Sequence, residues 1–338
     1  MPAKNPDEKS GERIAKVIAR AGLASRREAE AWIAAGRVAV NGAVIASPAL
    51  NVGAADRIAV DGKPLPGRER TRLFLHNKPP GLVTTHSDPQ GRPTIFGGLP
   101  RHLPRLISIG RLDLNTEGLL LLTNDGGLAR VLELPATGWQ RRYRVRAHGR
   151  VTQAALDGLR RGITIDGIRY GPIEATLDRE QGANVWLTFA IREGKNREVR
   201  NVLRSLDLQV NRLIRVSFGP FQLGDLRDGG VEEVPTKTLR EQLGERLSAL
   251  AQADFDAPVV ERAAPSPSRH PEGRARETRE PRRMAGKAPG RASFEGRPRR
   301  PPQDDGSTQK RDHTAKKKVR RDRKSGPRPK YPRDKRPR

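Results

Sequence analysis

A carboxylate lies close to an arginine in a short polar stretch of this chain. The stretch from Gly110 to Gly126 reads G-R-L-D-L-N-T-E-G-L-L-L-L-T-N-D-G, and it places Asp113 two residues after Arg111. A nearby cation favours the ionised form of a carboxylate, which can then act as a nucleophile or as a base. These residue types favour a catalytic role for Asp113. The alternative is a turn in which the side chain of Asp113 or Asn115 caps its own backbone.

A second candidate, Tyr143, lies in a segment with strict alternation. Residues 140–147 read Q-R-R-Y-R-V-R-A. Because side chains alternate across a strand, this period predicts a strand with a cationic face and an apolar face that includes Tyr143. A tyrosine on the inner face belongs either to the core or to a site, and the pattern leaves both readings open.

A third group of candidates surrounds the start of a predicted helix. The apolar residues Val199, Val202, Leu203 and Leu206 are spaced as one buried helix side. Basic residues repeat on another side, at Arg197, Arg200 and Arg204. Arg197 and the nearby Lys195 are alternatively suited to pair with backbone phosphates.

The elements expected to position Asp113 are two short strands. The runs are Leu106, Ile107 and Ile109 on one side and Leu119 to Leu122 on the other. Short apolar runs bounded by glycine are typical of buried strands. We therefore predict that R-L-D-L-N-T-E-G, residues 111–118, forms the loop at their ends.

The N-terminal part predicts a small module with one basic side. Apolar residues at helical spacing end at Gly22, and Ser25 to Glu28 has the form of a helix capping box. Alternating residues then lead to an Asn41-Gly42 turn. Exposed cations make this module a plausible platform for a phosphate backbone, and solvated charge is the alternative. These cations are Arg13, Lys16, Arg20, Arg26, Arg27 and Arg37.

The stretch from Gly110 resembles the G-R-L-D-x-x-T-x-G-L-L-L-L-T-N-D-G motif of the pseudouridine synthases, in the branch that modifies bacterial ribosomal RNA and carries an S4 domain. The match holds at every fixed position, and the resemblance extends from about Gly11 to about Val234. The family's K-P-x-G segment is present at Lys78, Pro79 and Gly81, although a strand and a turn explain these residues equally well. The N-terminal module is similar to the RNA-binding S4 domain.

This resemblance implies roles for single residues. Asp113 would be the essential carboxylate, Tyr143 would lie against the target base, and Arg200 would pair with the aspartate. Arg111 would occupy the gap that a flipped base leaves, and Lys195 and Arg197 would contact RNA. Two positions depart from the family pattern, because Arg141 replaces a common lysine and Glu198 replaces a familiar glutamine.

The implied reaction is the isomerisation of uridine to pseudouridine after the base leaves its stack. Such a reaction needs no cofactor. The S4 module with a long basic tail is most similar to the B-type enzymes that act on the large-subunit (23S) RNA. The alternatives are a small-subunit (16S) enzyme, a non-catalytic ribosome assembly factor, and a hydrolase that pairs Asp113 with Glu117 or Asp125.

Composition sets the outer bounds. The 338 residues carry a net charge of +27, and only 34% of them are hydrophobic. Residues 261–338 hold 27 lysines and arginines against 10 aspartates and glutamates, which predicts a disordered tail that attracts polyanions such as RNA. A solvated tether is the alternative. A membrane partner is disfavoured, because no stretch approaches the roughly 20 apolar residues needed to span a bilayer.

Missing residue types and motifs restrict the chemistry. The chain has no cysteine, and its six histidines show no metal-binding spacing. Glycine-rich nucleotide-binding strings are also missing, so neither a metal nor a nucleotide cofactor is expected. The first ten residues have no apolar core, so we expect no signal peptide and a cytoplasmic location. A monomer is the default expectation.

The order of elements favours an α+β fold built on a mixed, mainly antiparallel sheet. We predict an S4-like domain at 11–70, a catalytic domain at 73–248 and a disordered basic tail at 256–338.

Overall fold

The computed structural model describes residues 11–260. Residues 261–338 lie outside this range, so the predicted disorder of most of the tail falls on residues that the structure does not describe. In the described range, no helix is long and apolar enough to cross a membrane. The domain bounds given above remain predictions.

The N-terminal elements enclose a small core of their own. Ser25 Oγ accepts a hydrogen bond from Glu28 N at 3.1 Å, and Ser25 N donates to the Glu28 carboxylate at 2.6 Å, so the predicted capping box is confirmed. Asn41 and Gly42 both have positive φ, as a tight hairpin turn requires. Strands β2, β3, β5 and β6 form an antiparallel sheet. The elements are β1 (Glu12–Arg13), α1 (Ile14–Arg20), α2 (Arg26–Ala34), β2 (Val38–Val40), β3 (Ala43–Val44), β4 (Asn51–Val52), β5 (Ile58–Val60) and β6 (Lys63–Pro64).

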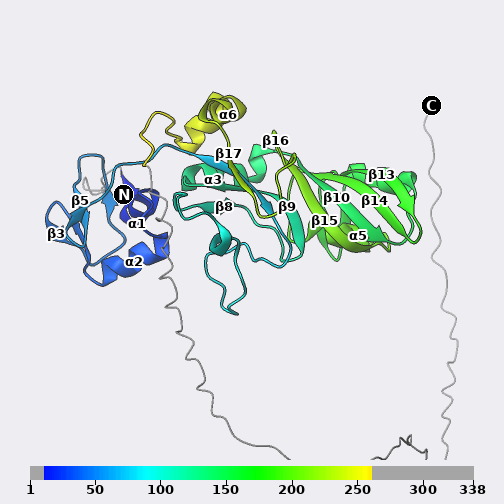
Figure 1. The fold of residues 1–338 in the computed structure, drawn as a ribbon, viewed down its shortest axis with the longest axis horizontal. Helices are drawn as coiled ribbons and strands as arrows, with labels where there is room; N and C mark the ends of the chain where they lie inside the picture. Colours follow the sequence, from blue (N-terminus) through cyan, green and yellow to red (C-terminus); the bar gives the residue numbers. More distant parts are fainter. Residues whose placement is uncertain (1–10, 261–338) are drawn as a thin grey trace, which may run out of the picture. The chain divides into compact units, whose positions relative to one another are not determined.

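A nine-stranded sheet is the largest sheet of the described chain (Figure 1). Its main path runs in the order β13-β14-β10-β15-β9-β7-β17, with β8 beside β9 and β16 beside β15. The β9–β15 pair is parallel and the other pairings of this sheet are antiparallel, which confirms the predicted fold class. The strands are β7 (Leu73–Lys78), β8 (Ile107–Ile109), β9 (Thr116–Thr123), β10 (Arg141–His148), β13 (Glu174–Gln181), β14 (Asn184–Ile191), β15 (Gln209–Phe218), β16 (Phe221–Gln222) and β17 (Val231–Glu233).

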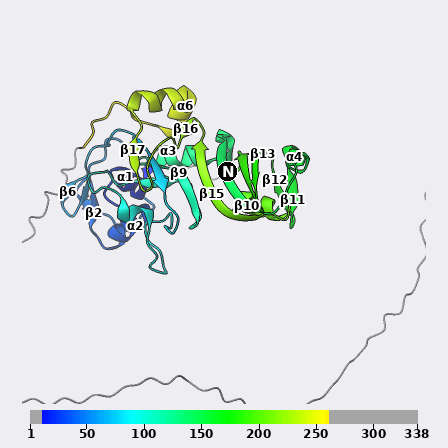
Figure 2. The same cartoon turned by 45° about the vertical axis from the view of Figure 1, so that its right-hand side comes forward.

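Helices cover parts of this sheet. Helix α5 packs on β15 and α4 packs on β13, at the end of the sheet where β11 and β12 form a hairpin (Figure 2). Helices α3 and α6 pack against each other in a separate core. The remaining elements are η1 (Ile95–Gly98), α3 (Gly126–Glu133), η2 (Pro135–Thr137), α4 (Gln153–Asp157), η3 (Gly158–Arg161), β11 (Ile163–Ile165), β12 (Ile168–Tyr170), α5 (Glu198–Arg204) and α6 (Thr236–Ala251), where η denotes a 3-10 helix.

The leucine run of β9 is buried on both faces of the sheet. Leu120 and Leu122 belong to the core under α4 and α5, whereas Leu119 and Leu121 belong to the core under α3 and α6. All four are fully buried. A strand covered on both sides needs continuous apolar residues rather than alternating ones, which explains the run that marked this strand in the sequence.

Candidate active site

Asp113 lies in the loop between β8 and β9, as predicted. The loop is shorter than expected, because Thr116 to Gly118 belong to β9 and not to the loop. These three residues pair in parallel with Leu213 to Arg215 of β15, and the hydrogen bonds of that partner extend the strand. Asp113 therefore lies three residues before the point where the two strands meet.

Lys78 fixes the backbone on the C-terminal side of Asp113. Its side chain is fully buried at the end of β7, and Nζ donates to the carbonyl oxygens of Pro79, Leu114 and Thr116 at 2.9, 3.1 and 3.0 Å. The ammonium group thus replaces lost hydration with three hydrogen bonds, which buried charge requires. One of those bonds holds the loop that carries Asp113, at Leu114, and another holds the first residue of β9, Thr116.

Thr84 fixes the backbone on the N-terminal side of Asp113. Its Oγ1 donates to the carbonyl oxygen of Leu112 at 2.9 Å, and the Leu112 amide lies 3.4 Å from the same hydroxyl. Leu112 is itself buried. The backbone is thereby held on both sides of Asp113, and a carboxylate on a fixed backbone is a preorganised group.

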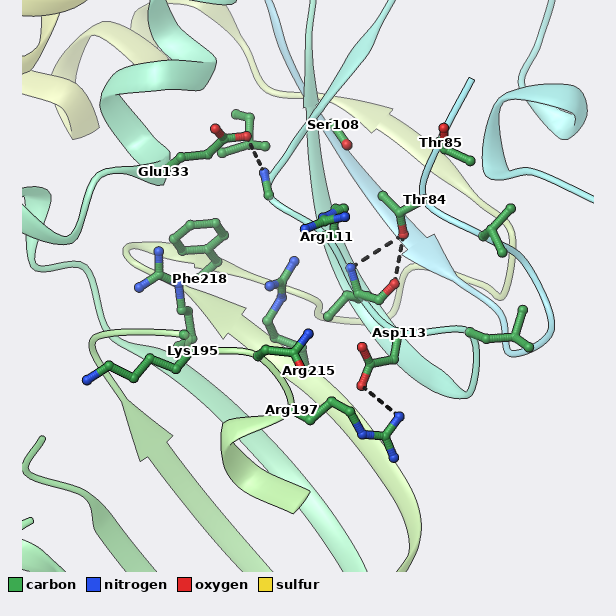
Figure 3. A pocket seen from close by; sticks show the side chains of 18 of the residues that line it. Thr84, Thr85, Ser108, Arg111, Asp113, Glu133, Lys195, Arg197, Arg215 and Phe218 are labelled. Atoms are coloured by element: carbon green, nitrogen blue, oxygen red, sulfur yellow. Dashed lines mark hydrogen bonds and ion pairs between the residues drawn. The ribbon is translucent and has the colours of Figure 1, made fainter. Parts of the chain in front are cut away.

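A cavity of about 870 Å³ opens beside this carboxylate. Figure 3 shows Asp113, Arg111, Lys195, Arg197 and Arg215 around it. The volume is within the range of small-molecule sites and suits a nucleoside.

Two arginines lie close to the Asp113 carboxylate. Arg197 Nη1 is 3.9 Å from Asp113 Oδ2, and Arg200 Nε is 4.0 Å from the same oxygen. Burial and the neighbouring Arg197 lower the pKa of Arg200, but a guanidinium stays protonated in proteins. Among the described residues no ion pair joins Asp113 to Arg111, the cation that the sequence places beside it. The cations that pair with Asp113 therefore come from the start of α5.

Arg200 is held for this position by the loop itself. Its Nη2 donates to the carbonyl oxygen of Asn115 at 3.3 Å, and Nη1 donates to that of Val210 at 3.4 Å. Its Nε is buried without a hydrogen-bond partner and has Asp113 as its nearest carboxylate among the ion pairs of residues 11–260. A shift of a few tenths of an ångström toward Asp113 would satisfy this donor.

Tyr143 belongs to both the core and the cavity wall. Its side chain is 7% exposed, and it packs among the apolar residues of β10 and β14 while also lining the cavity. The two readings that the sequence left open thus apply together. Arg215 lies directly opposite Tyr143 on β15 and lines the same cavity.

Comparisons with known proteins place both parts of the chain in known families. The S4 domain family matches residues 12–58, and the RNA pseudouridylate synthase family matches residues 72–205. An uncharacterized RNA pseudouridine synthase of Rickettsia prowazekii is 46% identical over 231 residues, which are 68% of this chain and 97% of the relative. The ribosomal large subunit pseudouridine synthase B of Pseudomonas aeruginosa is 41% identical, with 89% and 81% covered. The protein of that name from Haemophilus influenzae is 39% identical, with 77% and 75% covered.

The chain belongs to the RNA pseudouridine synthase family. The predicted family, its S4 domain and its isomerase activity on RNA are confirmed. In this pseudouridine synthase, Arg111, Asp113, Tyr143, Lys195 and Arg197 line one cavity. Arg200 lies behind Asp113.

The predicted RNA-binding residues of the N-terminal domain differ in whether a carboxylate of that domain pairs with them. Arg13, Arg26 and Arg27 are exposed. Lys16 and Arg20 both pair with Glu12, and Arg37 pairs with Asp61. These three cations have a carboxylate partner on the same domain, so phosphate contacts by them would have to compete with it.

The structure does not support a carboxylate-pair hydrolase. Glu117 pairs with Arg212 at 2.7 Å, and buried Asp125 caps α3 through the Gly127 amide at 2.7 Å. Neither carboxylate lines the cavity that contains Asp113. A paired mechanism needs both groups on one substrate.

Three residues that position the site were not given that role by the sequence. The Glu198 carboxylate accepts from the amides of Gly194 and Lys195 at 2.9 and 2.8 Å and so fixes the loop before α5, and burial raises its pKa. Arg215 was marked only by a charge at an inward position of β15. No sequence signal marked Thr84, because its contact is with a distant backbone carbonyl.

Proposed function

We propose that the chain isomerises a uridine of large-subunit (23S) ribosomal RNA to pseudouridine, with Asp113 as the essential group. The observation that supports this most directly is the position of the Asp113 carboxylate, on a fixed loop at the edge of a nucleoside-sized cavity and within 4.0 Å of two guanidinium groups. The choice of RNA rests on the names of relatives that are 41% and 39% identical.

The reaction breaks the bond from N1 of the base to C1′ of the ribose and forms a bond from C5 to the same C1′. The ionised Asp113 either attacks C1′, which expels the base, or removes the proton at C2′. In both routes the base then rotates and C5 bonds to C1′: this displaces Asp113 from C1′ in the first route, and in the second route the proton that Asp113 took returns to C2′. C5 loses its proton to solvent and N1 gains one, so the product is an isomer of the substrate. Arg197 and Arg200 place two positive charges within 4.0 Å of this carboxylate.

The target base must leave the RNA stack to reach Asp113. Tyr143 presents a ring at the cavity wall for the extruded base. Arg111, which is exposed and lines the same cavity, would fill the gap that the base leaves in the RNA. Lys195 and Arg197 provide cations at the rim for the flanking phosphates.

The first test is the Asp113→Asn variant. Amide and carboxylate have nearly the same shape, so RNA affinity should stay within about threefold of the unchanged protein while product formation falls by about 10³-fold or more, as for loss of a nucleophile. A matched control is Asp207→Asn, because Asp207 is exposed and has the positive φ that asparagine also adopts. Activity retained by Asp113→Asn would remove Asp113 from the mechanism.

The second test identifies the RNA. Unmodified 23S and 16S transcripts are incubated with the protein, and new pseudouridines are mapped by carbodiimide-dependent stops of reverse transcription. Product in 23S alone supports the proposal, and product in 16S alone assigns the small subunit. Binding without product in either RNA favours an assembly factor.

A further inference from the structure

A row of arginines lies on the sheet face opposite the candidate active site. Arg142, Arg144 and Arg146 alternate outward along β10, and Arg179 lies outward on β13. The other face of these strands carries Tyr143 and the core that α4 and α5 cover. We call Arg142, Arg144, Arg146 and Arg179 the arginine face; it spans the strands β10, β14 and β13 that lie side by side in Figure 1.

An indole ring organises the centre of the arginine face. The guanidinium carbons of Arg144 and Arg179 lie 5.0 and 5.6 Å from the ring centroid of Trp186 on β14. Cation–π contacts of this kind restrict side chains that would otherwise sample many rotamers. The arginines are therefore partly ordered before any partner binds, which lowers the entropic cost of binding.

The charge of this face is left without local compensation. Within residues 11–260, no carboxylate lies within 4.0 Å of the charged nitrogens of Arg144, Arg146 or Arg179. Asp178 is nearby, but its carboxylate accepts a hydrogen bond from the Thr188 hydroxyl at 3.0 Å.

The pairing of the strands adds repulsion. Arg146 lies directly opposite Arg212 of β15, and like charges at opposite positions of an antiparallel pair destabilise a sheet. Arg212 has Glu117 as its partner, whereas Arg146 Nε is buried without a hydrogen-bond partner. An external anion would offset both costs.

We propose that the arginine face binds the phosphate backbone of the same RNA whose uridine enters the cavity, through nucleotides at a distance from that uridine. Phosphate is the expected anion because the chain acts on RNA and planar guanidinium groups suit bidentate recognition of phosphate. Arg142 also donates to Gln140 Oε1 at 3.0 Å. A strand rise of about 3.4 Å places Arg142, Arg144 and Arg146 about 7 Å apart, in a line that an extended backbone can follow. The proposal rests on RNA being the substrate.

The experiment compares two double variants of equal charge. Arg144→Gln with Arg146→Gln neutralises the arginine face, and Arg160→Gln with Arg161→Gln neutralises two arginines of η3, which packs on the other side of β13. Affinity is measured for a short synthetic hairpin that carries the mapped uridine and for a long 23S fragment, over a range of salt concentrations. The short hairpin supplies the uridine and few nucleotides beyond the cavity, so turnover on it should be unchanged.

For the long fragment we expect the arginine-face variant to bind about tenfold more weakly, at roughly 0.7 kcal/mol for each charge. The slope of log affinity against log salt should fall by about 1.4 to 1.8, from two lost phosphate contacts. The η3 variant should change both values much less. Equal effects of the two variants, or no effect of either, would overturn the proposal.

Two more readouts distinguish RNA binding by the arginine face from a role in folding and from binding of an acidic protein. Urea unfolding should show the arginine-face variant to be about as stable as the unchanged protein, because the relieved repulsion and the lost contact of Arg144 with Trp186 oppose each other; a marked loss of stability would assign these arginines to the fold. Competition with polyglutamate tests the acidic partner. If polyglutamate binding depends on the arginine face and binding of the long RNA does not, the surface is a protein site and the proposal is wrong.

Loss of long-RNA affinity with normal hairpin turnover leaves the proposed activity intact, so the two proposals fail separately.

Discussion

At the scale of single residues, Lys78 holds a charge where no water reaches it. Burial lowers the pKa of Lys78 to about 8, against the smaller opposite effects of the Glu117 and Asp113 carboxylates. The protonated amine satisfies three carbonyl oxygens, of which that of Leu114 is in the loop of Asp113 and that of Thr116 begins β9. A neutral amine has one hydrogen fewer to donate, so the loop depends on the protonation state of this side chain.

We predict that single-turnover activity falls as pH rises through about 8. The protein should not unfold with it: between pH 8 and about 10.5 the unfolded chain binds more protons at this lysine than the folded chain does, so the contribution of Lys78 to the free energy of unfolding rises with pH. Rates on prebound RNA and thermal denaturation are measured over the same pH range. The Lys78→Gln variant should be less active and lack this alkaline limb, and an identical limb in that variant would exclude Lys78 as its origin.

At the scale of elements, the parallel contact of β9 and β15 joins the two cores of the catalytic part. A Cβ on Gly118 would lie 2.3 Å from the carbonyl oxygen of Arg215, and Gly118 has a φ of +94°. Glycine is therefore required both by the close approach and by the backbone conformation. The side chain of Arg215 spans the same junction, where Nε donates to the carbonyl oxygen of Leu119 at 2.7 Å.

The Gly118→Ala variant should separate these strands. We expect a loss of about 2–4 kcal/mol in the free energy of unfolding, from the steric overlap and the unfavourable φ together. Urea denaturation measures it. Gly98→Ala is the matched control, because no atom lies within 4 Å of its added Cβ, and its effect should stay within about 0.5 kcal/mol. Equal stabilities of the two variants would show that the junction adapts to a side chain.

At the scale of the whole molecule, most of the net positive charge lies in the C-terminal residues. Residues 261–338 carry a surplus of 17 positive charges out of the net +27. Charge of this density attracts RNA without reading its sequence, and the attraction weakens as salt displaces the contacts. Affinity at low salt and choice of uridine should therefore depend on different parts of the chain.

We predict that a chain ending at residue 260 binds RNA more weakly at low salt, converges with the full chain at high salt, and modifies the same uridine. Filter binding at several salt concentrations and mapping of the product measure these quantities. A full-length variant with the lysines and arginines of 261–338 changed to glutamine controls for length. An unchanged salt slope in both proteins would show that these charges do not contact RNA.

Local patterns were sufficient to predict many elements. The capping box at Ser25, the Asn41-Gly42 turn, the alternation around Tyr143 and the helix that starts at Glu198 are confirmed, because each depends on neighbours within a few residues. The bounds of β9 were wrong by three residues at its start. The hydrogen bonds that extend it come from β15, far along the chain, and no local pattern contains them.

By itself the sequence determined the family, the S4 domain, the α+β class and the importance of Asp113 as a candidate, because motif and periodicity are properties of residue order. Only the tertiary structure decided which groups surround that carboxylate. Arg197 and Arg200 lie within 4.0 Å of it, Lys78 and Thr84 hold its backbone, and Arg111, its neighbour in sequence, forms no ion pair with it in the described part of the chain. The physical reason is that charges and hydrogen bonds act over a few ångströms. Folding of the sheet brings residues that are far apart in the sequence within that distance of one another.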